Sequence, residues 1–220
     1  MSYQIAIDGP AGAGKSTIAK EIAKQLGFIY VDTGAMYRAM ALYLLRGEIP
    51  ADDSEKISAA SQKADITIAY KDGLQQVLLD GENVTAYLRT EEVGNMASVS
   101  SANPDVRKKL VELQQELASR ENVVMDGRDI GTCVLPNANV KIYLTASTAC
   151  RAKRRYDELT AKGEACDLAV IEADIEKRDH QDMTREHSPL RQAEDAVLLD
   201  SSDLTIQEVV EKILPLVKMQ

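Results

Sequence analysis

The stretch GPAGAGKS, at Gly9–Ser16, restricts the fold of this chain more than any other part of the sequence, because it fits the pattern G-x-x-x-x-G-K-[ST]. It lies between an apolar run, Tyr3–Asp8, and a helical pattern, Lys15–Gln25. In a strand–loop–helix unit of this kind, glycines let backbone N–H groups curl around an anion, and the helix N-terminus adds its positive dipole end. A glycine-rich turn that matches by chance is the alternative, but the position between strand and helix argues against it. The stretch therefore predicts a nucleoside triphosphate site.

Two side chains of this loop carry specific chemistry. Lys15 can reach the β- and γ-phosphates, and the Ser16 hydroxyl can be a ligand of Mg²⁺. The loop alone leaves two classes open: a switch or motor that hydrolyses the triphosphate, and a kinase that passes the phosphoryl group to a small molecule. A GTPase would carry an Asn-Lys-x-Asp segment that reads guanine, and the sequence has none.

Short apolar runs alternate with helical patterns along most of the chain. The expected strands are Tyr3–Asp8, Ile29–Asp32, Asn122–Asp126, Val140–Thr145 and Ala196–Asp200. The expected helices of this alternation are Lys15–Gln25, Thr33–Leu45, Ser147–Ala161, Leu168–Arg185 and Thr205–Val217. Alternation of this kind predicts an α/β fold, in which helices flank a parallel sheet.

One region interrupts the alternation. Two short alternating runs, ITIAY and QQVLLD, flank the turn KDGL and are followed by DGEN, so they predict a small antiparallel meander with Asp-Gly turns. A helix-rich segment, Thr90–Ser119, comes next, and Asn103-Pro104 marks a break and a new helix start within it. We interpret residues 65–104 as an insert in the α/β core.

Composition excludes several kinds of partner. A formal net charge of -9 argues against a nucleic-acid polymer or an anionic membrane surface, and no window approaches the ~18 apolar residues of a membrane span. The N-terminal stretch does not resemble a signal peptide, so we expect a cytoplasmic protein.

The three cysteines, Cys133, Cys150 and Cys166, make a poor zinc set with only two histidines, and we expect them to be reduced thiols. The absence of heptads and of a long apolar edge strand predicts a monomer.

A kinase needs an acceptor in line with the γ-phosphate and positive charge over the transferring group. Arg38 lies about one turn into the helix that follows the second strand, in DTGAMYR, where Thr33 can cap that helix. Arg128 follows the Asp126-Gly127 turn at the carboxyl end of a strand, where open α/β sheets bind ligands. Both arginines are candidates for an acceptor-phosphate site, with a solvated helix arginine as the alternative for Arg38. Asp126, which ends the strand, is the candidate for the magnesium side, through water.

Two further clusters lie on predicted helices, and each shares one helical face. The first consists of Arg151, Arg154 and Arg155. In an acidic protein such a cluster resembles a phosphate clamp, and a solvated basic face is the alternative. The second consists of Arg178, Asp182 and Arg185. It predicts either an internal ladder of salt bridges or a carboxylate for a ribose hydroxyl with arginines beside it.

Taken together, these motifs resemble a family. GPAGAGKST, DTGAMYR, NPDVRKKL, DGRDIGT, VKIYLTAS and the RD-x-x-D-x-x-R run appear in the order and at the spacing of bacterial cytidylate kinases. The resemblance covers essentially the whole chain. It implies a single P-loop kinase domain of residues 1–220, with a parallel five-stranded sheet, a monophosphate-binding insert at 65–104 that holds a small antiparallel sheet, and a helical lid at 151–170.

The resemblance also implies a reaction, in which ATP and CMP or dCMP give ADP and CDP or dCDP with Mg²⁺. It implies that the ATP phosphates are held by Gly9, Pro10, Ala11, Gly12, Ala13, Gly14, Lys15, Ser16 and Thr17. The CMP phosphate would be bound by Arg38 and Arg128, the base by Thr33, Arg107, Asp129 and Arg185, and the sugar by Ser98, Arg178 and Asp182. The catalytic charges would be Lys15, Arg128, Arg151 and Arg155, and the metal-binding residues Ser16 and Asp126. Some members of the family carry Ser where this chain has Thr33.

The chemistry of cytosine agrees with this assignment. A carboxylate such as Asp129 can accept a hydrogen bond from the exocyclic amino group, and Arg107 can donate to N3 and O2. Uracil would place a carbonyl against Asp129, which costs at least ~1 kcal/mol. The alternatives are another small-molecule P-loop kinase, for UMP, AMP or a non-nucleotide acceptor, and a triphosphate-dependent switch with a protein partner.

Overall fold

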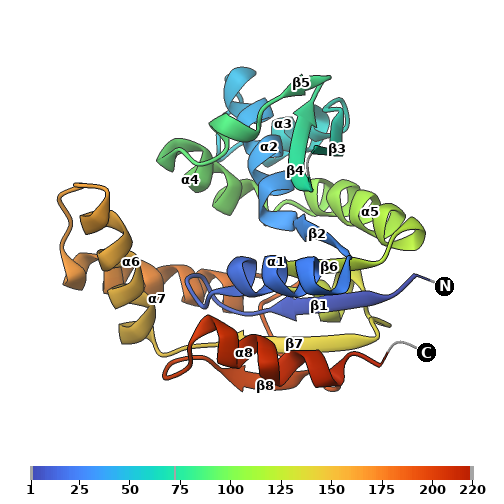
Figure 1. Cartoon of the computed structure of the whole chain (residues 1–220). Coiled ribbons are helices and arrows are strands. Elements are labelled where there is room, and N and C mark those ends of the chain that lie inside the picture. Colours follow the sequence, from blue (N-terminus) through green and yellow to red (C-terminus); the bar gives the residue numbers. More distant parts are fainter. Residues whose placement is uncertain (1, 72, 219–220) are drawn as a thin grey trace. The chain divides into compact units, whose positions relative to one another are not determined.

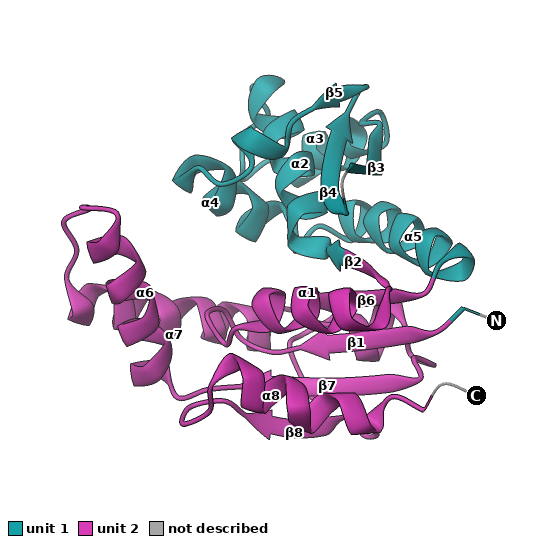
Figure 2. Cartoon of the chain, in the orientation of Figure 1, with its two compact units in different colours: residues 1–2, 31–121 teal, residues 3–30, 122–220 magenta. Residues whose placement is uncertain are grey.

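The computed structural model describes residues 2–71 and 73–218, which form two compact units. Unit 1 comprises residues 1–2 and 31–121, and unit 2 comprises residues 3–30 and 122–220 (Figure 2). Each unit has its own hydrophobic core. The predicted insert, residues 65–104, lies within unit 1.

Parallel strands form the framework of unit 2 (Figure 1). The five strands of the sheet are β1 (Gln4–Asp8), β2 (Ile29–Asp32), β6 (Val123–Gly127), β7 (Val140–Thr145) and β8 (Val197–Asp200). The last two residues of β2 are assigned to unit 1. The strands lie in the order β2-β6-β1-β7-β8, which confirms the predicted alternation. Because β1 and β6 are parallel neighbours and Asp8 lies opposite Gly127, the turns that follow these two strands emerge at the same edge of the sheet.

Two helices of unit 2 pack against the sheet through apolar side chains. Helix α1 (Lys15–Leu26) contributes Ile18 and Ile22 to the core, and α8 (Ile206–Ile213) contributes Val210. Figure 1 shows α1 and α8 lying side by side. Helix α1 ends at Gly27, which adopts a φ of 69°, a left-handed conformation that glycine accepts without a Cβ penalty.

The predicted lid region, residues 151–170, spans most of α6 (Thr148–Ala161) and the start of α7 (Leu168–Thr184). These two helices pack on each other. Ser147 caps α6 by accepting from the N–H of Cys150, and Asp167 caps α7. Both caps satisfy N–H groups that have no partner inside the helix.

Unit 1 combines helices with an antiparallel sheet. Its helices are α2 (Thr33–Arg46), α3 (Ser54–Ser61), α4 (Glu91–Ser100) and α5 (Pro104–Arg120). Its strands are β3 (Ile66–Lys71), β4 (Leu74–Leu79) and β5 (Glu82–Asn83), in that order. The sheet confirms the predicted meander; Asp72, in its KDGL turn, lies outside the described residues. The predicted helix start is also confirmed, since Asn103 caps α5 and Pro104 occupies its first turn.

Several local predictions were wrong or incomplete. The predicted cap at Thr33 is instead made by Asp32, whose carboxylate accepts from the N–H of Ala35 at 2.9 Å, because the residue just before the helix has the extended backbone that a cap needs. Helix α3 was not predicted. The last helix was predicted to reach residue 217, but α8 ends at Ile213 and a 3₁₀ turn with a proline, η3 (Leu214–Leu216), follows.

Candidate active site

The phosphate loop connects β1 to α1, and its backbone needs glycine at two positions. Gly9 has a φ of 150°, and a Cβ at this residue would lie 1.9 Å from the carbonyl oxygen of Leu144. Gly14, with a φ of 89°, is the N-cap of α1, and its carbonyl accepts from the N–H of Ile18 at 3.1 Å. The loop therefore begins close against β7 and leads directly into a helix N-terminus, where anions bind.

Lys15 is buried within this loop, and its Nζ donates a hydrogen bond to the carbonyl of Pro10 at 2.7 Å. Burial lowers the pKa of Lys15 to about 7, and the positive charge of Arg128 acts in the same direction, while Asp126 and Asp8 oppose the change. A buried ammonium loses hydration that a nearby anion would replace. An incoming phosphate would therefore stabilise the charged form of Lys15.

Ser16 and Asp126 contact each other directly. The Ser16 hydroxyl donates to Oδ2 of Asp126 at 2.9 Å, and the hydroxyl of Tyr30 donates to Oδ1 at 2.8 Å. These are hard oxygen donors of the kind that Mg²⁺ prefers, and Mg²⁺ commonly uses only one or two protein ligands beside phosphate and water. In the described part of the chain there is no cluster of three or more His, Cys, Asp or Glu side chains that could hold a metal. The pair Ser16 and Asp126 thus fits magnesium bound together with a nucleotide.

The turn after β6 brings together charged side chains that are far apart in the sequence. Nε of Arg128 donates to Oδ2 of Asp182 on α7 at 2.7 Å. Arg185, just past the end of α7, donates to Oδ1 of the buried Asp129 at 3.4 Å and to the carbonyl of Ser188 at 2.6 Å. Four of the predicted substrate residues are therefore gathered on one side of unit 2: Arg128, Asp129, Asp182 and Arg185.

Two further residues of this region were missed by the sequence analysis. Asp8, the last residue of β1, is 5% exposed and accepts hydrogen bonds from the backbone N–H groups of Ile130 and Gly131, both at 2.7 Å. Tyr30 fixes one oxygen of Asp126. The available signal for Asp8 was its position, because it ends an apolar strand just before the loop, as Asp126 does in VVMDGRDIGT.

The three arginines of α6 contact different groups. Arg151 is 4% exposed, forms an ion pair with Asp179 of α7 at 2.7 Å and donates to the carbonyl of Ala11 in the phosphate loop at 3.0 Å. Arg154 donates to the carbonyl of Ser201 at 2.6 Å, whereas the exposed Arg155 pairs with Glu158. On α7, Arg178 is exposed. Arg151 thus ties both lid-region helices to the phosphate loop.

Four predicted substrate residues belong to unit 1. Thr33 and Arg107 are buried, and the guanidinium of Arg107 lies 5.7 Å from the ring centre of Tyr37. Arg38 pairs with Asp32 at 3.2 Å, and among the described residues no atom accepts from its buried Nε–H. Ser98 is half-buried on α4.

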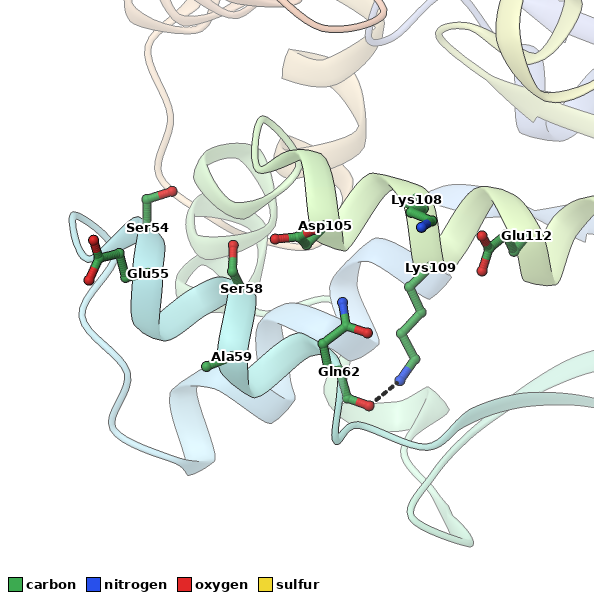
Figure 3. Close-up of a pocket in the computed structure, with 9 residues that line it drawn as sticks. All are labelled: Ser54, Glu55, Ser58, Ala59, Gln62, Asp105, Lys108, Lys109 and Glu112. Atoms are coloured by element: carbon green, nitrogen blue, oxygen red, sulfur yellow. Dashed lines mark hydrogen bonds between the residues drawn. The ribbon is translucent and has the colours of Figure 1, made fainter.

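Unit 1 also contains an open groove of about 860 Å³ between α3 and α5 (Figure 3). It is lined mainly by polar side chains, among them acidic ones such as Glu55 and basic ones such as Lys108. Lys109, at its edge, donates to the carbonyls of Ser61 and Gln62 at the end of α3. None of the predicted site residues lines this groove.

Comparison with known proteins gives consistent results. The family described as cytidylate kinase matches residues 5–219. A cytidylate kinase of Caldicellulosiruptor bescii is 55% identical over 212 residues, which cover 96% of this chain and 94% of that protein. One of Desulfitobacterium hafniense is 52% identical over 215 residues, covering 98% and 92%. A shikimate kinase structure from Bacteroides thetaiotaomicron, 13% identical and covering 97% of both chains, has a TM-score of 0.50 and shows the shared fold alone. Among the described residues, no helix has the length and apolar character needed to cross a bilayer.

Proposed function

Because the chain belongs to the cytidylate kinase family, we propose that it transfers the γ-phosphoryl group of ATP to CMP or dCMP. An oxygen of the CMP phosphate attacks the γ-phosphorus, the bond to the β,γ-bridging oxygen breaks, and CDP and ADP leave. The observation that carries the proposal is the juxtaposition, at one edge of the unit 2 sheet, of the phosphate loop with the Arg128–Asp129 turn. The phosphate loop would bind the triphosphate of the donor, and the Arg128–Asp129 turn would recognise the acceptor.

The donor side is the loop Gly9–Thr17. Its backbone N–H groups would hold the ATP phosphates, and Lys15 would exchange its bond to the Pro10 carbonyl for the β- and γ-phosphates. Ser16 and Asp126 would hold magnesium, which when bound neutralises phosphate charge. The acceptor phosphate is already anionic, so the chain supplies position and positive charge rather than a general base.

The acceptor phosphate would be bound by Arg38 and Arg128. The buried Nε–H of Arg38 supports this role, because an unsatisfied buried donor costs about 1–3 kcal/mol, which a phosphate oxygen would recover. Arg128 is already oriented by Asp182. The positive charge of both side chains complements a dianionic phosphate.

We assign the base to Asp129, Arg185, Arg107 and Thr33. The buried carboxylate of Asp129, which forms an ion pair with Arg185 at 3.4 Å, would accept from the cytosine amino group. The sugar would be contacted by Ser98, Arg178 and Asp182. Arg151 and Arg155 belong to the lid region, and there the contact of Arg151 with the Ala11 carbonyl supports a role beside the ATP phosphates.

A panel of acceptors in a coupled ADP-release assay tests the proposal. CMP and dCMP should be phosphorylated at 1–100 per second or so, the usual range of kinases, and UMP and AMP should be poor substrates. Preference for UMP, AMP or a non-nucleotide acceptor would identify a different small-molecule kinase. Slow ATP hydrolysis that CMP does not stimulate would instead favour a switch.

A further inference from the structure

Asp129 occupies a position where an aspartate ordinarily caps a helix. It directly precedes a π-helical turn, η2 (Ile130–Val134), and its carbonyl accepts from the N–H of Cys133 at 2.8 Å. An aspartate at such a position would normally turn its carboxylate back onto the first N–H groups of the helix. Its side chain makes no capping hydrogen bond here, and instead Oδ1 accepts from Arg185.

The cap of this turn comes from another strand. The two carboxylate oxygens of Asp8, at the end of β1, accept the N–H groups of Ile130 and Gly131, each at 2.7 Å. Burial raises the pKa of Asp8 to about 6, although the two N–H donors oppose the shift. At neutral pH the side chain is therefore ionised and has both oxygens available as acceptors.

The fit between Asp8 and this turn is close. A Cβ added at Gly131 would lie 3.3 Å from Oδ2 of Asp8 and 3.2 Å from Cδ of Lys141. A glycine at this position lets the backbone approach the carboxylate on one side while Lys141 covers the other. The Asp8 carboxylate thus holds the first residues of η2, and through them the backbone of Asp129.

We propose that Asp8 is a positioning residue for base selection: by capping η2 in place of Asp129, it leaves the Asp129 carboxylate directed toward Arg185 and the cytosine amino group. The inference rests on the proposed function, since it gives Asp129 the task of reading the base. Without two acceptors at residue 8, the first N–H groups of η2 would lose their partners, and the backbone of Asp129, which directly precedes them, would no longer be held in place. The carboxylate that distinguishes cytosine from uracil would then move away from the base.

The test compares Asp8→Asn with the unaltered enzyme by measuring kcat/KM for CMP and for UMP, and KM for ATP. An amide of the same size can accept only one of the two N–H groups, because its NH₂ faces the other. The ratio of kcat/KM for CMP to that for UMP should fall about tenfold, the effect of one lost hydrogen bond to a charged group, while KM for ATP stays within about threefold.

Two variants sharpen this test. Gly131→Ala leaves Asp8 in place but crowds its carboxylate, so it should lower the same ratio and provides a second route if Asp8→Asn folds poorly. Asp53→Asn is the matched control, because Asp53 caps α3, a helix that contains none of the predicted site residues. Its CMP to UMP ratio should be unchanged, and circular dichroism melting checks that all variants are folded.

The outcomes separate the two proposals. If the unaltered enzyme does not prefer CMP to UMP, the proposed function fails. If it does prefer CMP but the ratio is unchanged in Asp8→Asn and Gly131→Ala, the inference about Asp8 is overturned. A parallel loss for CMP, UMP and ATP would also overturn it, because it would show that Asp8 only supports the fold of the phosphate loop.

Discussion

The turns that follow β1 and β6 leave neighbouring parallel strands at the same edge of one sheet, but they are built differently. The turn after β1 relies on backbone: glycines with positive φ lead into the N-terminus of α1. The turn after β6 relies on side chains: Arg128 is oriented by Asp182 of α7, and Asp129 by Arg185, just past the end of that helix. Backbone N–H groups bind any phosphate chain, whereas side chains can discriminate between bases. Under the proposed function, binding of the donor and choice of the acceptor would therefore reside in separate turns.

The largest effect is expected in the turn after β1. Lys15→Ala should lower kcat by about a hundredfold or more, because the transferring phosphoryl group loses a preorganised positive charge. Steady-state assays at saturating CMP measure the loss. The ratio of CMP to UMP use should be unaffected, and a drop in kcat of less than tenfold would show that this cation does not act on the reaction.

In the turn after β6, Asp129→Ala should reduce kcat/KM for CMP by roughly 10- to 100-fold, with KM for ATP nearly unchanged, because only the base loses its hydrogen-bond acceptor. Assays with each substrate varied in turn separate the two values. If CMP use were unaltered, Asp129 would have no part in reading the base.

The matched variant Asp129→Asn tests whether the preference between CMP and UMP shifts toward UMP. An amide can donate to the carbonyl of uracil through its NH₂ group or accept from the cytosine amino group through its oxygen. In Asp129→Asn, kcat/KM for UMP should therefore rise relative to that for CMP. In Asp129→Ala, kcat/KM for CMP should fall, but UMP gains no new hydrogen-bond donor. The same coupled assay with both acceptors decides this.

Asp126 connects the two turns, since it lies next to the last residue of β6 and accepts a hydrogen bond from Ser16 of the phosphate loop. Asp126→Asn should raise the magnesium concentration for half-maximal activity by about tenfold, because a neutral amide is a weaker partner for the hydrated ion. Asp200→Asn is the control: Asp200 lies at the end of another strand of the sheet but is exposed and accepts from Ser202. An unchanged magnesium dependence in Asp126→Asn would remove Asp126 from the metal site.

The smallest expected effect is the uptake of a proton by Lys15 when ATP binds. The pKa of Lys15 is lowered to about 7, first by burial and then by Arg128, so at pH 8 the side chain is mostly neutral. Bound triphosphate favours the charged form, and ATP binding at pH 8 should take up about one proton. Calorimetry in buffers of different ionisation enthalpy measures this uptake. It should vanish in Lys15→Arg, whose side chain stays protonated, and equal enthalpies in all buffers for the unaltered enzyme would contradict the lowered pKa.

Much of the fold could be predicted because local signals and tertiary structure agree. The strands of the parallel sheet are apolar runs next to turn residues, and the start of α5 is marked by Asn103 and Pro104. Helix α3 was missed since it is short, with few apolar residues, and its buried side chains depend on the core of unit 1. The cap at Asp32 was missed because Asp32 and Thr33 are both good capping residues, and only the backbone conformation decides between them.

Candidate site residues could be named from the sequence where a motif carries its own chemistry, as at Lys15 and Ser16. The contacts of Asp8 and Tyr30 could not be predicted, because they join distant parts of the chain: Asp8 and Ile130 are 122 positions apart. Arg154 and Arg155 were predicted to share a helical face with Arg151, but adjacent residues of a helix point in different directions, and the two contact Ser201 and Glu158, respectively. The spacing of residues along a helix predicts the direction in which each side chain points, whereas the packing around the helix determines which group it contacts.

A crystal structure of the protein with CMP bound tests most directly the claim that the turn after β6 chooses the acceptor. The account predicts a carboxylate oxygen of Asp129 about 3 Å from the exocyclic amino nitrogen of cytosine, with Asp8 still bound to the N–H groups of Ile130 and Gly131. A cytosine amino group that faces any other residue, with Asp129 turned back onto η2, would contradict it.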